Sequence, residues 1–181
     1  MNLPNIITLG RLLCVPVAIW LVLSGWLTAA FWLFVAAGLS DAVDGFVAKR
    51  FDLRSRLGAL LDPIADKTLL VSMYVTLGIA GHLPNWLVIL VVFRDVLIIG
   101  GYLLVATLAQ TMRAEPLFVS KLNTALQIAL IGIVLAVLGL RLDDFGLHVG
   151  LVYAVAVTTV VSGAGYLVRW TRALAGTEQA P

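Results

Sequence analysis

The chain has 181 residues, of which 61% are hydrophobic and 12% are charged, and its formal net charge is +2. Soluble domains carry about 25% charged residues, so this composition excludes an ordinary soluble domain and indicates an integral membrane protein. The single cysteine, Cys14, excludes an intramolecular disulfide and a cysteine-based metal site. The N-terminal stretch lacks a basic segment followed by a small-residue cleavage site, so we expect no cleavable signal peptide.

Six hydrophobic segments follow one another along the chain. A bilayer core of about 30 Å requires roughly 20 residues of helix, and the first segment reaches this length only if its helix begins near Ile6. We expect an all-α fold of six transmembrane helices, near 12–24, 26–48, 57–80, 84–109, 122–140 and 146–170. We also expect a single membrane domain over residues 1–174, followed by a disordered tail over 175–181.

Basic residues are distributed unevenly between the two ends of these segments. One end would carry Arg11, Lys49, Arg50, Arg54, Arg56, Arg113, Lys121, Arg169 and Arg172, and the opposite loops only Arg141, beside Asp143 and Asp144. Because cytoplasmic loops carry an excess of Lys and Arg, both termini and the loop between the second and third segments are predicted to be cytoplasmic. We expect a protein of a bacterial inner (cytoplasmic) membrane.

Four aspartates lie in the second and third segments, and each would cost about 2.5–3.5 kcal/mol at the centre of a membrane helix. Their pattern is Asp41-x2-Asp44-Gly45-x2-Ala48-Lys49-x8-Gly58-x3-Asp62-x3-Asp66. Residues three or four apart share a helix face, and the short connection makes the two helices antiparallel neighbours. The carboxylates therefore converge, and their all-oxygen chemistry favours Mg²⁺ or Mn²⁺ over Zn²⁺.

A carboxylate cluster of this kind suits phosphoryl transfer. Two divalent cations a few ångströms apart can stabilise an in-line displacement at phosphorus, and a nearby carboxylate can accept the proton of an attacking hydroxyl. Gly45 and Gly58 leave room for a ligand beside the helix backbone. The basic residues of the 49–56 connection indicate a substrate that contains a pyrophosphate and whose remainder lies in lipid.

Further polar residues lie in the fourth and fifth segments, and each allows two interpretations. Arg94 and Asp95 are adjacent and would point about 100° apart on a helix, so we do not expect them to form a simple pair. Arg94 is a candidate functional residue, whereas Asp95 suits a structural partner equally well. Asn123 and Gln127 begin the fifth segment, where such residues often only bond neighbouring helices.

The acidic pattern resembles the signature of the CDP-alcohol phosphatidyltransferases. The departure is Lys49, where that family usually has Arg; Lys keeps the charge but loses the bidentate fork that suits phosphate. Residues 2–11 resemble the family's N-terminal stretch, a short interfacial helix ahead of the first transmembrane helix.

Two further strings resemble one branch of the family, the CMP-forming cardiolipin synthases. They are Arg94-Asp95-Val96 and the segment 118–127. The related phosphatidylglycerolphosphate synthases usually carry Arg-Glu in the first string and a second lysine where this chain has Asn123.

The resemblance implies six transmembrane helices, a homodimer and an active site that faces the cytoplasm. By position, two divalent cations, Mg²⁺ or Mn²⁺, would be held by Asp41, Asp44, Asp62 and Asp66. Asp66 would be the general base, and the CDP moiety would be bound by Gly45, Ala48, Lys49 and Gly58. An acceptor hydroxyl would attack CDP-diacylglycerol and expel CMP, with Arg94, Lys121 and Asn123 as candidate acceptor contacts.

The choice of acceptor depends on how many basic side chains lie beyond the acidic motif. Glycerol 3-phosphate is a small dianion that requires several Lys or Arg donors, whereas phosphatidylglycerol is a monoanionic lipid. The few basic residues of the last three segments favour phosphatidylglycerol, and hence cardiolipin synthesis, with phosphatidylglycerolphosphate synthesis as the alternative.

Two other protein classes remain open. An acidic-lined cation transporter would spread its carboxylates along a pore and would not need Gly45 and Gly58 at these offsets. A purely structural membrane protein would tolerate Asp→Asn substitutions. We expect no nucleic-acid partner.

Overall fold

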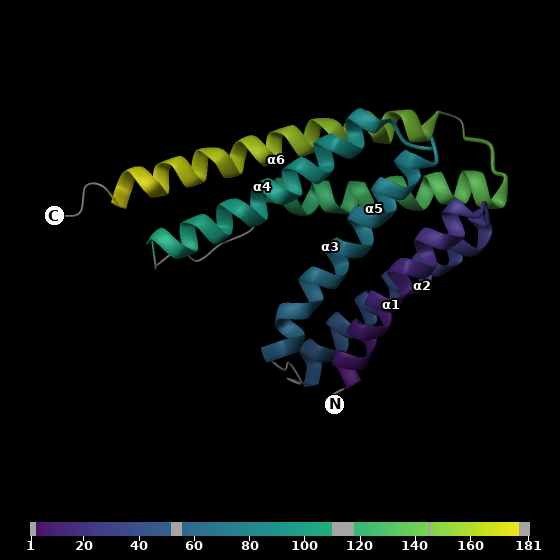
Figure 1. Ribbon diagram of the computed structural model, residues 1–181, viewed down its shortest axis with the longest axis horizontal. Coiled ribbons are helices and arrows are strands. Elements are labelled where there is room, and N and C mark those ends of the chain that lie inside the picture. The colour runs from purple at the N-terminus through teal and green to yellow at the C-terminus, as the bar shows by residue number, and fades with distance from the viewer. Residues whose placement is uncertain (1–2, 52–55, 110–117, 145, 178–181) are drawn as a thin grey trace. The chain divides into compact units, whose positions relative to one another are not determined.

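The computed structural model describes residues 3–51, 56–109, 118–144 and 146–177, with side-chain surroundings for 10–40, 67–101, 118–144 and 146–171. Within these ranges all regular secondary structure is helical (Figure 1). The helices are α1 Leu3–Leu23, α2 Leu27–Phe51, α3 Arg56–Ile79, α4 Asn85–Ala109, α5 Phe118–Leu140 and α6 Leu147–Thr177. The all-α prediction is therefore confirmed, and each predicted segment corresponds to one of these helices.

Both ends of the helical region differ from the prediction. The expected interfacial helix is not separate, because α1 continues without interruption from Leu3 to Leu23. Pro4 lies in the first turn, where its missing N–H has no helical partner to lose, and Gly10 weakens a helix without removing a donor. At the other end α6 continues to Thr177, three residues into the segment predicted to be a disordered tail.

Glycines with positive φ end α1 and α3, where the sequence predicted breaks. Gly25 has φ 76° and its N–H donates to Val22, while the N–H of Trp26 donates to Leu21 at 2.8 Å. The N–H groups of Gly81 and His82 repeat this arrangement after α3. This is the Schellman motif, in which a left-handed residue turns the chain and satisfies the last carbonyls of the helix.

Two helices are long and apolar enough to cross a membrane, as judged by length and composition over the described residues. These are α5 and the Leu147–Thr171 part of α6. Shorter apolar stretches lie in α1, α2 and α3, at Gly10–Leu23, Leu27–Ser40 and Lys67–Ile79. The length and composition of these helices are consistent with a helical membrane protein.

The contacts divide the chain into two units. The first comprises Met1–Pro84 and Ile131–Phe145. In this unit α1 packs against both α2 and α3 (Figure 1). Its core is apolar and includes the buried side chains of Ala18, Val22, Ala30, Met73, Tyr74 and Leu77.

The second half of α5 packs along α2 within the first unit. The Thr28 hydroxyl donates to the Gly139 carbonyl at 2.6 Å, and Gly132 faces the Phe34 ring. Because residue numbers fall along α5 as they rise along α2, the two helices are antiparallel. Small residues such as Gly139 allow this close approach of two helix backbones.

The second unit comprises Asn85–Leu130 and Gly146–Pro181. Here α4 and α6 lie side by side. At one end of the contact between these helices, the ring centroids of Trp86 and Tyr153 are 6.3 Å apart. At the other end Gly101 lies against the Trp170 ring, which a side chain at position 101 would overlap. Residue numbers rise together along both helices, so α4 and α6 are parallel.

Gly139→Ala should destabilise the protein by about 1–3 kcal/mol, because overpacking must move one of two helix backbones. A Cβ at this position would lie 2.8 Å from backbone atoms of Leu27 and Thr28. Thermal unfolding of the purified protein in detergent measures the effect. Gly132→Ala is the matched control, since its Cβ would meet Phe34 at an ordinary 4.0 Å. Equal stability of the two variants would contradict the packing of α2 against α5.

Candidate functional site

The acidic motif lies on two helices of the first unit. Asp41 and Asp44 belong to α2, and Asp62 and Asp66 belong to α3, so each pair shares a face of its own helix. The side chains of these four residues lie outside the described residues, as do those of the predicted CDP contacts Gly45, Ala48, Lys49 and Gly58. Oxygen donors at helical spacing fit a hard divalent cation.

Elsewhere, no group of three or more His, Cys, Asp or Glu side chains that could hold a metal occurs in the part of the chain whose side chains are described. The metal prediction therefore depends on the acidic motif alone. The most detailed polar site that the structure does describe lies in the second unit, where α4, the start of α5, and α6 contribute side chains.

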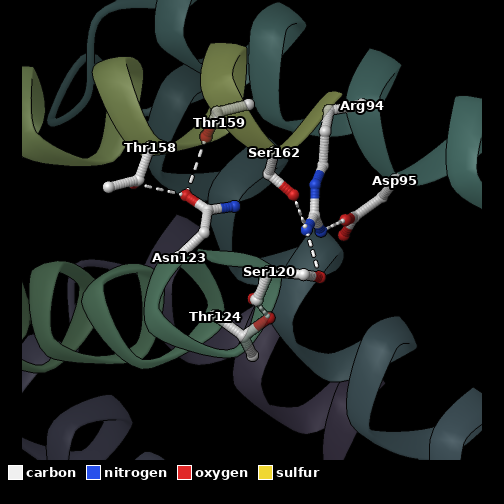
Figure 2. Close-up of polar contacts among 8 residues, drawn as sticks. All are labelled: Arg94, Asp95, Ser120, Asn123, Thr124, Thr158, Thr159 and Ser162. Atoms are coloured by element: carbon white, nitrogen blue, oxygen red, sulfur yellow. Dashed lines mark hydrogen bonds and ion pairs between the residues drawn. The ribbon is translucent and has the colours of Figure 1, made fainter. Parts of the chain in front are cut away.

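Arg94 is at the centre of this site (Figure 2). Its side chain is only 3% exposed, and its Nη1 lies 2.6 Å from the Asp95 carboxylate, which is itself 4% exposed. Its Nη2 donates to the hydroxyls of Ser120 on α5, at 2.5 Å, and Ser162 on α6, at 2.7 Å. One guanidinium thus joins three helices, and we call Arg94, Asp95, Ser120 and Ser162 the arginine junction.

The prediction that Arg94 and Asp95 do not pair is wrong. Neighbouring residues leave a helix in different directions, but the arginine side chain has a long and flexible stem that can bend back toward the carboxylate. Burial favours the pairing, because an unpaired charge in the interior destabilises the protein far more than bending the arginine side chain toward its neighbour does. The pair carries no net charge.

Asn123 forms a second contact between α5 and α6 (Figure 2). Its Oδ1 accepts hydrogen bonds from the hydroxyls of Thr158, at 2.8 Å, and Thr159, at 2.9 Å. The Asn123 side chain is fully buried, and its Nδ2 has no hydrogen-bond partner among the described residues. The interpretation of Asn123 as a bond between helices is confirmed, and we call Asn123, Thr158 and Thr159 the asparagine contact.

Lys121 lies on α5 between these two sets of contacts. It is the one charged residue of α5, and its side chain is exposed. The three candidate acceptor residues therefore differ: Arg94 and Asn123 are buried and hydrogen-bonded to protein, whereas Lys121 is accessible.

Sequence reasoning missed the partners on α6, none of which was among the predicted site residues. Ser162 lies four residues after Thr158 and three after Thr159, so the three hydroxyls form a polar stripe on one face of an otherwise apolar helix. Ser120, Asn123 and Gln127 form a similar stripe on α5. Two polar stripes on apolar helices were the signal that these faces pack against polar partners.

Comparison with known proteins defines the family. The family model for CDP-alcohol phosphatidyltransferase matches residues 1–163, a range that includes the whole acidic motif and both sets of polar contacts. The chain belongs to the CDP-alcohol phosphatidyltransferase family. The resemblance inferred from the acidic motif is thereby confirmed.

Relatives within the family differ in the activity that their names give. A cardiolipin synthase (CMP-forming)/mitochondrial hydrolase fusion protein of Schizosaccharomyces pombe is 36% identical over 182 residues, covering 92% of this chain and 31% of that protein. A human cardiolipin synthase (CMP-forming) is 36% identical over 151 residues, covering 75% of this chain and 50% of that protein. A probable phosphatidylglycerophosphate synthase of Mycobacterium tuberculosis is 32% identical over 188 residues, covering 98% and 86%.

The buried ion pair of this CDP-alcohol phosphatidyltransferase family member gives a stability prediction. Arg94→Met should destabilise the protein by about 3–5 kcal/mol, because the Asp95 carboxylate stays buried without its guanidinium partner. The double variant Arg94→Met/Asp95→Leu removes both charges and should be more stable than Arg94→Met alone. Thermal unfolding in detergent compares them. A double variant less stable than Arg94→Met would show that the two charges are not coupled.

Proposed function

We propose that the protein transfers the phosphatidyl group of CDP-diacylglycerol to a hydroxyl of phosphatidylglycerol, forming cardiolipin and releasing CMP. The acidic motif on α2 and α3, in a chain of the CDP-alcohol phosphatidyltransferase family, carries this proposal. The S. pombe and human cardiolipin synthases, each 36% identical to the chain, support the choice of product.

The residues proposed to bind the donor, CDP-diacylglycerol, include four carboxylates and one lysine. We assign two divalent cations, Mg²⁺ or Mn²⁺, to Asp41, Asp44, Asp62 and Asp66. When bound, such cations supply positive charge to the phosphate oxygens. Gly45, Ala48 and Gly58 leave space for the CDP moiety along the helices, and Lys49 contributes a positive charge to its pyrophosphate.

Asp66 acts as the general base for the acceptor. It takes the proton of the acceptor hydroxyl as that oxygen forms a bond to the phosphorus on the lipid side of the pyrophosphate. The bond between this phosphorus and the CMP oxygen breaks, and CMP leaves.

We assign the acceptor region to the surroundings of Arg94, Lys121 and Asn123, with Lys121 as the side chain that would contact the acceptor. The guanidinium of Arg94 is already neutralised by Asp95, which leaves Lys121 as the exposed cation of α5. This one exposed cation of α5 suits the single negative charge of a phosphodiester better than the two charges of glycerol 3-phosphate. This distribution of charge supports phosphatidylglycerol as the acceptor.

The membrane setting follows from the same proposal. We assign all six helices to transmembrane spans in a bacterial inner membrane, with the acidic motif toward the cytoplasm and a homodimer as the assembly. Support comes from the two helices of spanning length and from the basic residues that lie near the acidic motif.

Phosphatidylglycerolphosphate synthesis is the second candidate. The M. tuberculosis relative named a probable phosphatidylglycerophosphate synthase matches 98% of this chain and is matched over 86% of its own length. Because this relative matches the chain over nearly the full length of both proteins, glycerol 3-phosphate is the competing acceptor.

Product identification distinguishes the two acceptors. Purified protein with CDP-diacylglycerol and Mg²⁺ or Mn²⁺ should form cardiolipin and CMP with phosphatidylglycerol, and no product with glycerol 3-phosphate. Mass spectrometry of separate reactions detects each lipid. Phosphatidylglycerolphosphate as the product would contradict the acceptor assignment, and absence of CMP in both reactions would contradict the transferase proposal.

Asp66→Asn should reduce CMP release by at least about 10²-fold, in the range that general-base catalysis contributes, while the variant remains folded. Chelation of divalent cations with EDTA should stop the unaltered enzyme, and added Mg²⁺ or Mn²⁺ should restore it. Asp143→Asn, at an exposed residue outside the motif, is the matched control and should retain activity. Unchanged transfer by Asp66→Asn would favour a structural role for the aspartates.

A further inference from the structure

The beginning of α5, over residues 120–123, is held on two sides by polar contacts. On one side Ser120 accepts a hydrogen bond from Arg94 of α4, whose Nη2 also reaches Ser162 of α6. On the other side Asn123 accepts hydrogen bonds from Thr158 and Thr159 of α6. We propose that these contacts are a positioning device that fixes the turn carrying Lys121, so that its ammonium group meets the anionic phosphate of the acceptor in one place.

Arg94 is a positioning residue in this proposal and does not contact the acceptor. Its side chain is 3% exposed, and the Ser162 side chain against it is fully buried. Three of its five N–H groups already donate to Asp95, Ser120 and Ser162 (Figure 2). A phosphate would have to displace one of these partners to form a bidentate contact, which would leave a buried polar group unsatisfied.

Lys121 has the opposite properties. Its side chain is exposed, and it lies one residue after Ser120 and two before Asn123, between the two sets of contacts. An exposed lysine has a flexible stem with several rotatable bonds, so its charge is placed accurately only if the backbone beneath it is fixed. Holding the backbone of this turn reduces the ordering that the acceptor must otherwise provide when it binds.

The proposal rests on the proposed function in one respect, namely that the acceptor is anionic. It holds for a phosphodiester lipid and for a phosphomonoester alike. The kinetic test therefore uses whichever of phosphatidylglycerol and glycerol 3-phosphate the unaltered enzyme accepts.

Ser162→Ala removes one hydroxyl from the arginine junction and keeps both charges of the Arg94–Asp95 pair. It should raise the KM for the acceptor about fivefold, the effect of one hydrogen bond, and leave the KM for CDP-diacylglycerol within about twofold. Ser162→Thr, which keeps a hydroxyl, should restore the acceptor KM. Thr171→Ala is the matched control, because its hydroxyl donates to the Val168 carbonyl of the same helix and takes no part in the arginine junction. Equal increases in both KM values would overturn the proposal.

A double-variant comparison tests whether the junction acts through Lys121. Lys121→Ala should raise the acceptor KM by itself, and adding Ser162→Ala to it should produce no further increase, because residues that act as a unit are not additive. Additive increases would show that Ser162 acts independently of Lys121, and would overturn the positioning role.

Hydrogen exchange separates failure of this proposal from failure of the proposed function. In Ser162→Ala the amides of residues 122–126 should exchange about fivefold faster, as expected for loss of one hydrogen bond, while those of 130–136 stay unchanged. This readout requires no activity. If the unaltered protein releases no CMP with either acceptor, the proposed function fails, and exchange alone then decides whether the junction holds the turn. Unchanged exchange at 122–126 would overturn the inference.

Discussion

The Arg94 guanidinium carries a full positive charge into a helical interior, and this charge must be neutralised and hydrogen-bonded where it lies. An ionisable residue in such a place is expensive and usually faces the interior of a helix bundle with a partner. Here the neighbouring carboxylate of Asp95 removes the net charge, and two serine hydroxyls take further N–H groups. The three helices that supply these groups are therefore fixed to one another at this depth.

Polar contacts determine the register between neighbouring helices, which apolar packing alone leaves undetermined. The outer faces of these helices are rich in exposed Val, Leu and Ile, and lipid is as apolar as such side chains, so burial of apolar surface discriminates poorly between alternative registers. A hydroxyl or amide that loses its hydrogen-bond partner in an apolar interior raises the free energy of the folded state. The arginine junction and the asparagine contact consequently define the register of α5 against α6.

The first unit achieves close packing by different means. Ala18 and Ala30 are buried in its core. The Gly139 carbonyl accepts a hydrogen bond from the Thr28 hydroxyl where the backbones of α2 and α5 approach each other. The acidic motif lies on helices of this unit. Under the proposed function its four carboxylates would have the opposite electrostatic requirement from Arg94, since like charges brought together need external cations, whereas Arg94 is neutralised by its own neighbour. On that proposal the motif binds ligands, whereas the arginine junction joins helices of the protein itself.

The sequence alone determined the six helical segments found in the described part of the chain, the breaks at Gly25 and Gly81, and the acidic motif with its family. These features depend on local signals, namely the length of apolar runs, the positive φ that glycine permits, and the spacing of residues along one helix. The continuous α1 was not anticipated, because nothing in residues 2–11 distinguishes a separate helix from the first turns of a longer one.

Only the tertiary structure decided which groups Arg94 and Asn123 contact. Arg94 reaches Ser120 and Ser162, which are 26 and 68 residues away, and Asn123 reaches Thr159 at a separation of 36. Helical periodicity indicates that polar residues share a face but does not indicate which face of another helix lies opposite. The pairing of Arg94 with Asp95 likewise depends on the conformation of a long side chain, which is determined by the packing around it and not by the order of residues.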